Sequence, residues 1–180
     1  MAVKAVLMEE SAVIRAMTRI SHEILEKNRG TEGICLVGIR RRGAALAEMI
    51  ADNILKFEGV RVPCGDIDIS YYRDDISTLS DMPVLKKTEL PFSIAGKKVI
   101  LVDDVLYTGR TVRAAIEAVF SVGRPASIQL AILIDRGHRE LPIRADFVGK
   151  NIPTSHSELI CVHIPPFDGE TAVTLTDNEG

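Results

Sequence analysis

The most constraining stretch of this 180-residue chain is an apolar run that ends in two aspartates. Val99 to Val102 are all apolar, Asp103 and Asp104 follow, and a short loop leads to Thr108-Gly-Arg-Thr111, where a helical pattern begins. Consecutive apolar residues bounded in this way are typical of a strand buried on both faces, as in a parallel sheet. The stretch therefore predicts a strand, a polar loop and a helix in succession.

The polar loop has the chemistry of a phosphate cradle. Backbone N–H groups from Thr108 to Thr111 would converge at a helix N-terminus, where unpaired donors and the helix dipole favour an anion. Gly109 allows the backbone to approach the phosphate closely. The aspartate pair can accept hydrogen bonds from sugar hydroxyls or hold a hydrated magnesium ion. A phosphorylated sugar would satisfy both halves, whereas the alternative is an ordinary strand followed by a capped helix.

Two other phosphate motifs are excluded. The stretch lacks the Gly-Lys-Ser/Thr of a Walker loop and the G-x-G-x-x-G of a dinucleotide fingerprint. The anion would therefore be bound by a cradle of a different kind.

Composition limits the classes of protein to consider. With 180 residues and 46% hydrophobic content, the chain is long enough for one well-buried α/β domain and short for two. The net charge of −3 and the pI near 5.8 give no general sign of a nucleic-acid binder. A nucleic-acid role would have to rest on a local basic face.

The cysteine spacing favours a reducing compartment, and the hydropathy gives no sign of a membrane protein. Cys35, Cys64 and Cys161 are far apart and odd in number, which indicates neither a disulfide framework nor a zinc site, so we expect reduced core residues. No apolar run reaches the ~18 residues that span a bilayer, and no signal-peptide pattern opens the chain. We expect a cytoplasmic protein with no membrane partner.

Apolar periodicity predicts alternating strands and helices, which is typical of a parallel sheet with helices on both faces. Ligands of such sheets bind at the carboxyl ends of the strands. The expected strands are Val3–Met8 (an edge strand), Gly33–Gly38, Val62–Tyr71, Val99–Val102, Ser127–Ile134 and Ala172–Thr176, and the expected helices are Glu10–Asn28, Ala44–Leu55 and Val112–Val122.

Two of these helices show a clear apolar face. In the first, the apolar positions are Val13, Ile14, Met17, Ile20, Ile24 and Leu25, and in the last they are Val112, Ala115, Ile116, Val119 and Phe120. The opposite face of the first helix presents Arg15, Thr18, Arg19 and His22, which are neighbours at helical spacing. This polar face is either an ordinary solvated surface or a binding surface.

A second strand–loop–helix unit contains Ile39-Arg-Arg-Arg-Gly43. Three arginines beside a helix start would suit a diphosphate, although a surface basic run is the alternative. A long polar connection from about residue 72 to 91 is more often a mobile functional loop than a filler, and a solvated loop is again the alternative. Arg73 is its main candidate for contact with an anion, and Lys86 and Lys87 are weaker ones.

The stretch from Val99 to Thr111 resembles the phosphoribosyl pyrophosphate (PRPP) motif of the type I phosphoribosyltransferases. The resemblance implies that Asp103 and Asp104 hold the ribose hydroxyls, and that Thr108, Gly109, Arg110 and Thr111 hold the 5′-phosphate. It assigns the pyrophosphate to the other basic loop, which in this family often contains a non-proline cis peptide, with Mg²⁺ arriving on PRPP rather than in a dedicated protein site. The implied pyrophosphate residues are Arg40, Arg41 and Arg73.

A closer resemblance extends over roughly residues 3 to 164. The stretches Thr18-Arg-Ile-Ser-His-Glu23, Asp66-Ile-Asp-Ile-Ser-Tyr-Tyr-Arg-Asp-Asp75 and 135–155 are similar to those of bacterial regulators of pyrimidine operons that are also uracil phosphoribosyltransferases. This implies one phosphoribosyltransferase domain over 1–180, with a central, mainly parallel sheet flanked by helices and a small hood at about 135–157. Uracil would be selected there, by Asp135, Arg136, Ile152 and Ser155.

The same resemblance implies two roles. The enzyme would convert uracil and PRPP to UMP and pyrophosphate. The regulator would bind leader mRNA of the pyrimidine operon, with UMP or UTP raising its affinity, and would act as a homodimer or larger homo-oligomer. A salvage enzyme without an RNA role is the alternative. The implied RNA contacts are Thr18, Arg19, His22, Arg139, Arg144 and Lys150.

Overall fold

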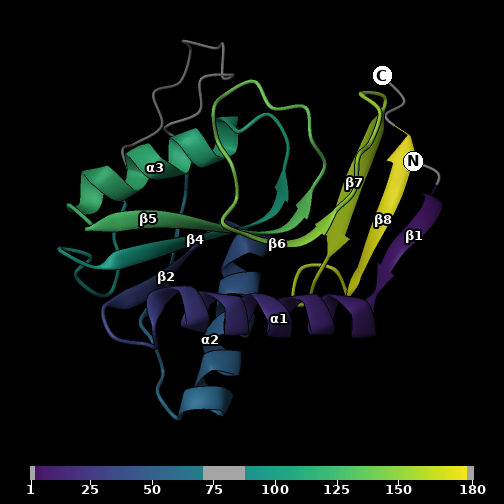
Figure 1. The fold of residues 1–180 in the computed structure, drawn as a ribbon. Coiled ribbons are helices and arrows are strands. Elements are labelled where there is room, and N and C mark those ends of the chain that lie inside the picture. Colours follow the sequence, from purple (N-terminus) through teal and green to yellow (C-terminus); the bar gives the residue numbers. More distant parts are fainter. Residues whose placement is uncertain (1–2, 71–87, 178–180) are drawn as a thin grey trace.

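A computed structural model describes residues 3–70 and 88–177 and contains two sheets (Figure 1). The larger sheet is parallel, with strand order β3-β2-β4-β5-β6, and the smaller is antiparallel, with order β1-β8-β7. The strands of the larger sheet are β2 (Ile34–Ile39), β3 (Cys64–Ile67), β4 (Lys98–Leu106), β5 (Ser127–Asp135) and β6 (Phe147–Asn151), and those of the smaller are β1 (Val3–Glu9), β7 (Glu158–His163) and β8 (Ala172–Asp177).

Helices cover both faces of the parallel sheet, as the alternating pattern predicted (Figure 1). The helices are α1 (Glu10–Asn28), α2 (Arg42–Glu58) and α3 (Arg110–Val122). Side chains of α1 and α2 share one buried cluster with Leu36 and Ile100, whereas those of α3 share another with Val37 and Leu101. Adjacent residues of a strand point to opposite faces, so the runs in β2 and β4 are apolar throughout because each is buried on both sides.

The central strand β4 is longer than predicted and includes the acidic pair. It pairs with β2 on one side and β5 on the other, with Asp103 opposite Ile132. Ladder hydrogen bonds to β5 continue past the aspartates to Leu106. The carboxylates therefore extend from the end of a rigid strand rather than from a loop.

Some predicted core positions are wrong. Ile14 on α1 is 48% exposed and Phe120 on α3 is 57% exposed, while Ala114 and Ala118 are buried instead. The small alanine side chains let α3 approach the sheet closely, so the buried face of the helix is narrow. Phe120 lies at the margin of this face and stays in solvent. The predicted strand Val62–Tyr71 is shorter in the structure, where β3 ends at Ile67.

The antiparallel sheet joins the two ends of the chain. β1 is an edge strand, as predicted, and it pairs with β8, which in turn pairs with β7. The part of the molecule next to the predicted hood is therefore built from both termini, and β6, which falls inside the predicted 135–157 segment, belongs to the parallel sheet.

The cysteines are all free thiols, of which Cys35 is buried and Cys64 and Cys161 are half-buried. Burial raises the pKa of the Cys35 thiol to about 11. None of the helices in residues 3–70 and 88–177 has the length and apolarity that a membrane crossing requires.

Candidate functional site

A cavity of about 300 Å³ lies at the carboxyl edge of the parallel sheet, where β2 and β4 end. Its walls come from both predicted anion-binding units, so the structure brings the acidic pair and the arginine loop together as expected. The residues that line it are Ile39, Arg40, Arg41, Arg42, Asp68, Ile69, Ser70, Asp103, Asp104, Val105 and Thr111.

The two aspartates differ in environment. Asp103 is only 7% exposed, and its Oδ1 accepts a hydrogen bond of 2.9 Å from the backbone N–H of Asp104. Burial raises the pKa of the Asp103 carboxyl well above its usual value, and the charge of Asp104 acts in the same direction. Asp104 is half-buried, and its Oδ1 accepts from the N–H of Val105 at 2.8 Å.

The packing of α2 against β4 brings the arginine loop to the aspartates. A Cβ on Gly43 would stand 2.4 Å from the carbonyl oxygen of Val102 and 3.3 Å from Asp103 Oδ1, so the start of α2 lies directly against the end of β4. Only glycine permits this approach. The peptide bond between Arg40 and Arg41 is cis, as the resemblance implied.

The three arginines of this loop have different partners. Arg40 is exposed and its Nε donates to Asp66 Oδ2, a bond that raises the pKa of the guanidinium. Arg41 is exposed at the edge of the cavity. Arg42 makes a two-pronged contact with Asp168, with Nε at 3.0 Å from Oδ2 and Nη2 at 2.8 Å from Oδ1. Arg73, Lys86 and Lys87 lie outside the described residues.

A second hollow of about 280 Å³ is formed by residues 105–112, which include the predicted phosphate loop. Gly109 precedes α3 with φ +97°, a conformation that favours glycine. The side chain of Thr108 accepts from the N–H of Arg110 at 3.3 Å. The guanidinium of Arg110 donates to Glu140 at 2.9 Å, so this side chain is anchored outside the loop. The loop thus presents the start of α3, where backbone donors and the helix dipole suit an anion.

Residues 138–143 wrap over this loop. The N–H groups of Glu140 and Leu141 donate to the carbonyl of Thr108 at 2.9 and 3.3 Å. Arg139 donates to the carbonyls of Tyr107 and Ile143 at 2.7 and 3.0 Å and forms an ion pair of 2.5 Å with Asp135. These bonds hold the Tyr107 and Thr108 carbonyls on the side of the loop that faces residues 138–143.

The four residues predicted to contact uracil lie around the ends of β5 and β6. The N–H of Ile152 donates to the carbonyl of Asp135 at 2.9 Å, and the carboxylate of Asp135 also accepts from the N–H of Gly137 at 3.0 Å. Arg136 is only 4% exposed, and its guanidinium donates to Thr154 Oγ1 and to the carbonyl of Ser155. Arg136 therefore positions the segment that contains Ser155.

The acidic side chains that line the 300 Å³ cavity fit a hydrated Mg²⁺ that would arrive bound to PRPP phosphates. Asp68, Asp103 and Asp104 supply carboxylate oxygens, the ligands that magnesium prefers. No group of three or more His, Cys, Asp or Glu side chains with metal-binding geometry is found among residues 3–70 and 88–177.

Three of the predicted RNA contacts lie together on α1. Thr18, Arg19 and His22 lie with Ile14 on the outer face of α1, around a shallow depression of about 480 Å³. The ring of His22 stacks on Phe57, with 3.9 Å between ring centroids.

The outer face of α1 is joined to β6. Arg19 donates to the carbonyls of Val148 and Gly149 at 3.1 and 2.5 Å, and also pairs with Glu23 at 2.8 Å. Arg144 precedes β6, Lys150 lies in it, and both are exposed. The structure thus places five of the six predicted RNA contacts on neighbouring elements, whereas Arg139 lies at the phosphate loop.

Several residues of the site were missed from the sequence. Arg42 was not distinguished from its neighbours, because nothing in the sequence indicates its partner Asp168, which lies 126 positions away. Tyr107 was passed over although it lies inside the motif, and its ring contacts the Arg136 guanidinium at 4.0 Å. Asp68 and Ser70 could have been found from their position directly after a predicted strand.

Comparisons with known proteins identify the family of this chain. Residues 6–163 match the phosphoribosyl transferase domain family. The chain is 57% identical over 176 residues to the "Bifunctional protein PyrR" of Acetivibrio thermocellus, covering 98% of this chain and 96% of that protein. It is 59% identical over 169 residues to the protein of the same name from Caldicellulosiruptor bescii, covering 94% of this chain and 93% of the relative.

A solved structure supports the fold independently. The hypoxanthine phosphoribosyltransferase of Trypanosoma cruzi superposes with a TM-score of 0.74 at 20% identity and 98% coverage of both chains. At this identity the likeness shows the fold alone. Taken with the match to the domain family and to the bifunctional relatives, it shows that the chain belongs to the PyrR family of type I phosphoribosyltransferases.

Proposed function

We propose that this protein regulates a pyrimidine operon by binding its leader mRNA and also catalyses the synthesis of UMP from uracil and PRPP. The observation that best supports the enzymatic role is the shared cavity, in which Asp103 and Asp104 face the arginine loop next to the phosphate loop. PRPP carries phosphate groups on both C5 and C1 of its ribose, so it needs two anion sites with hydroxyl acceptors between them.

In this proposal each part of the site binds one part of PRPP. The start of α3, with Thr108, Gly109, Arg110 and Thr111, binds the 5′-phosphate. The carboxylates of Asp103 and Asp104 accept hydrogen bonds from the ribose hydroxyls. The acidic pair lies in β4 and the phosphate loop follows it directly, so the ribose would be held at a fixed distance from the sheet. Binding energy is used in this way to orient the reacting carbon.

Arg40 and Arg41 stabilise the departing pyrophosphate, and Arg73 is a further candidate. As the bond to C1 breaks, positive charge develops on the ribose and negative charge on the leaving group, so fixed cations at the leaving group lower the barrier. Mg²⁺ bound with PRPP would add positive charge at the same phosphates. No nucleophilic side chain is required, because the attacking atom is a nitrogen of uracil.

Uracil would be held by the segment that follows β6, including Ile152 and Ser155, together with Asp135 and Arg136 at the end of β5. These residues leave the sheet at the same carboxyl edge as the phosphate loop. The base would therefore lie within reach of C1 of a ribose bound on Asp103 and Asp104.

In the regulatory role, the product site becomes a sensor for uridine nucleotides. The outer face of α1 (Thr18, Arg19, His22) and the β6 side (Arg144, Lys150) would contact RNA, with Arg139 as a further candidate. Arginine and lysine would bind phosphates, while Thr18 and His22 would read unpaired bases or 2′-hydroxyls. UMP or UTP would raise RNA affinity only if it binds the RNA-competent state more tightly.

The proposed ligands also indicate where the protein works and how it assembles. A leader mRNA and PRPP are both found in the bacterial cytoplasm, which is where we place the protein. One chain presents few basic residues to a stem-loop, so we expect a homodimer or larger homo-oligomer.

The enzymatic role is tested by incubating the purified chain with Mg²⁺, PRPP and labelled uracil. We expect labelled UMP and stoichiometric pyrophosphate, and no product with hypoxanthine. Absence of UMP would contradict the enzymatic role, and synthesis of UMP without any binding of leader RNA would favour the salvage enzyme.

A further inference from the structure

A tight turn, Ser155 to Glu158, follows the segment in which we place uracil recognition. The N–H of Glu158 donates to the carbonyl of Ser155 at 3.3 Å, and β7 starts at Glu158. The turn is anchored to the phosphate loop, because the hydroxyl of Tyr107 lies 3.2 Å from Nδ1 of His156. The turn is therefore in contact with the predicted phosphate loop rather than a remote surface feature.

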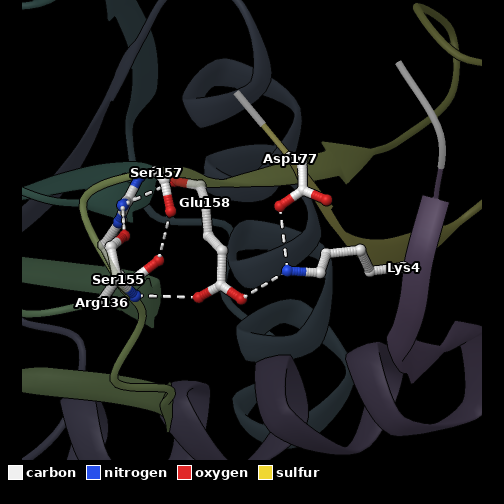
Figure 2. Close-up of polar contacts among 6 residues, drawn as sticks. All are labelled: Lys4, Arg136, Ser155, Ser157, Glu158 and Asp177. Carbon is white, nitrogen blue, oxygen red and sulfur yellow. Dashed lines mark hydrogen bonds and ion pairs between the residues drawn. The ribbon is translucent and has the colours of Figure 1, made fainter. Parts of the chain in front are cut away.

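Two charged side chains hold this turn from opposite sides (Figure 2). From inside, Nη2 of the buried Arg136 donates to the carbonyls of Ser155 and Glu158 at 3.0 and 2.8 Å. From outside, Oε2 of Glu158 accepts from the N–H of Ser155 at 2.8 Å. The position of Ser155 thus depends on bonds to both its N–H and its carbonyl.

Lys4, on the first strand of the chain, fixes the orientation of the Glu158 carboxylate. Its Nζ lies 3.2 Å from Oε1 of Glu158 and 2.9 Å from Oδ1 of Asp177 (Figure 2). One carboxylate oxygen of Glu158 is therefore used by Lys4 and the other by Ser155. The N–H of Ser155 and the ammonium of Lys4 together hold the pKa of Glu158 below its usual value.

We propose that Glu158 is a positioning residue for uracil, acting through the backbone of Ser155, and that Lys4 holds Glu158 in place for that task. The inference rests on the proposed function, because it assigns the base to residues 152–155. Exposed ion pairs add little to stability. We therefore expect the network to fix the position of Ser155 rather than to stabilise the fold. A small displacement of a group that binds a substrate lowers activity strongly.

The test compares kinetic constants of variants of the full chain. Glu158→Ala removes the acceptor for the Ser155 N–H, so we expect the KM for uracil to rise roughly tenfold while the KM for PRPP stays within about twofold. Glu158→Gln should recover much of the loss, because an amide oxygen can still accept from that N–H. Lys4→Met should raise the KM for uracil by about twofold, since the turn keeps its acceptor but loses the group that orients it.

Asp177→Asn is the matched control. It removes the negative charge of the other partner of Lys4 without touching the turn, and we expect both KM values to be unchanged. If Asp177→Asn and Glu158→Ala raise the KM for uracil equally, or if Glu158→Ala raises both KM values together, the network only stabilises the small sheet and the inference is wrong.

A second measurement does not depend on activity. Amide hydrogen exchange of residues 154–158 should be faster in Glu158→Ala than in the parent chain, and unchanged exchange would contradict the positioning role. A parent chain that makes no UMP would contradict the proposed function, whereas a parent that makes UMP with a Glu158→Ala variant of normal uracil KM would overturn this inference alone.

Discussion

The guanidinium carbon of Arg136 lies 4.0 Å from the centre of the Tyr107 ring. Tyr107 belongs to the loop that would bind the 5′-phosphate, and Arg136 holds the segment after β6 that would bind the base, with 2.9 Å between its Nε and Thr154 Oγ1. A cation over an aromatic face is attracted to the ring, more strongly when the pair is shielded from water. The loop proposed to bind phosphate and the segment proposed to bind the base are therefore in direct contact.

The surface proposed to contact RNA is connected to the same region through β6. Arg19 on α1 donates to the carbonyls of Val148 and Gly149 in that strand, and the strand leads directly to Ile152. A nucleotide that orders the segment after β6 would thus act on a strand that contacts α1. This is the physical basis on which we expect nucleotide and RNA binding to be coupled.

Replacing Asp104 with asparagine should impair the use of PRPP. The carboxylate is a stronger acceptor for ribose hydroxyls than an amide, and loss of its charge would also weaken binding of the proposed Mg²⁺ at the same cavity. We expect the KM for PRPP to rise by roughly tenfold, which corresponds to about 1.4 kcal/mol. Steady-state kinetics at saturating uracil measure this, and an unchanged KM for PRPP would refute the ribose role of Asp104.

Replacing Asp103 with asparagine should stabilise the fold near neutral pH. Burial raises the pKa of Asp103, so the folded chain keeps this proton to a higher pH than the unfolded chain. Stability is therefore lost as pH rises through the folded-state pKa, and asparagine avoids that loss. We expect the Tm of Asp103→Asn to be higher by roughly 2–4 °C, the change that corresponds to about 1 kcal/mol in a chain of this size.

Thermal unfolding followed by circular dichroism tests the Asp103 prediction. The Tm advantage of Asp103→Asn should be clear near pH 7.5 and should shrink near pH 4, where the parent carboxyl is protonated in the folded state. An advantage of the same size at both pH values would show that the gain has another cause.

Gly109→Ala should damage phosphate binding more than it damages stability. The φ of +97° is strained for alanine, so the loop would have to move away from the geometry that presents its N–H groups. We expect about 1 kcal/mol lower stability and a several-fold higher KM for PRPP. Gly59→Ala is the control, because Gly59 also has a positive φ of +69° but lies at the end of α2, away from the site. Equal KM values in the two variants would contradict the role of Gly109.

Thr18→Ala and Arg144→Gln should separate the two activities. Thr18 lies on α1 and Arg144 before β6, and neither lines the cavities of the nucleotide site. We expect RNA affinity to fall by roughly tenfold in each variant, as for the loss of one good contact, while UMP synthesis stays normal. Filter binding and a uracil assay on the same preparations measure this. If both activities fall together, the RNA surface is misassigned.

The sequence predicted the centre of the parallel sheet well, because the apolar runs of β2 and β4 are buried on both faces and each of these strands is followed by a helix. The motif from Val99 to Thr111 also placed the acidic pair beside the phosphate loop. Exposure at the margins of helices could not be predicted, as Ile14 and Phe120 show, because the width of a buried stripe depends on how closely the helix approaches the sheet. Periodicity alone does not contain that distance.

Contacts between residues far apart in the sequence could not be predicted either. The pairing of β1 with β8 joins the two ends of the chain, and the ion pair of Arg42 with Asp168 joins the arginine loop to a segment that had no recognisable pattern. The hydrogen-bond partners of Arg136 and Arg139 could not be predicted either, because both arginines bond mainly to backbone carbonyls, which every residue has. Such partners are determined by the fold and not by residue type.

The central claim is that one site serves both as an active site and as a nucleotide sensor that controls RNA binding. Its most direct test is the affinity for labelled pyrimidine-operon leader RNA, measured by filter binding with and without UMP over a series of salt concentrations. We predict that UMP increases the affinity by roughly tenfold, and that affinity falls as salt rises because lysine and arginine contact phosphates. An affinity that UMP leaves unchanged, or the absence of salt-sensitive binding, would contradict the account.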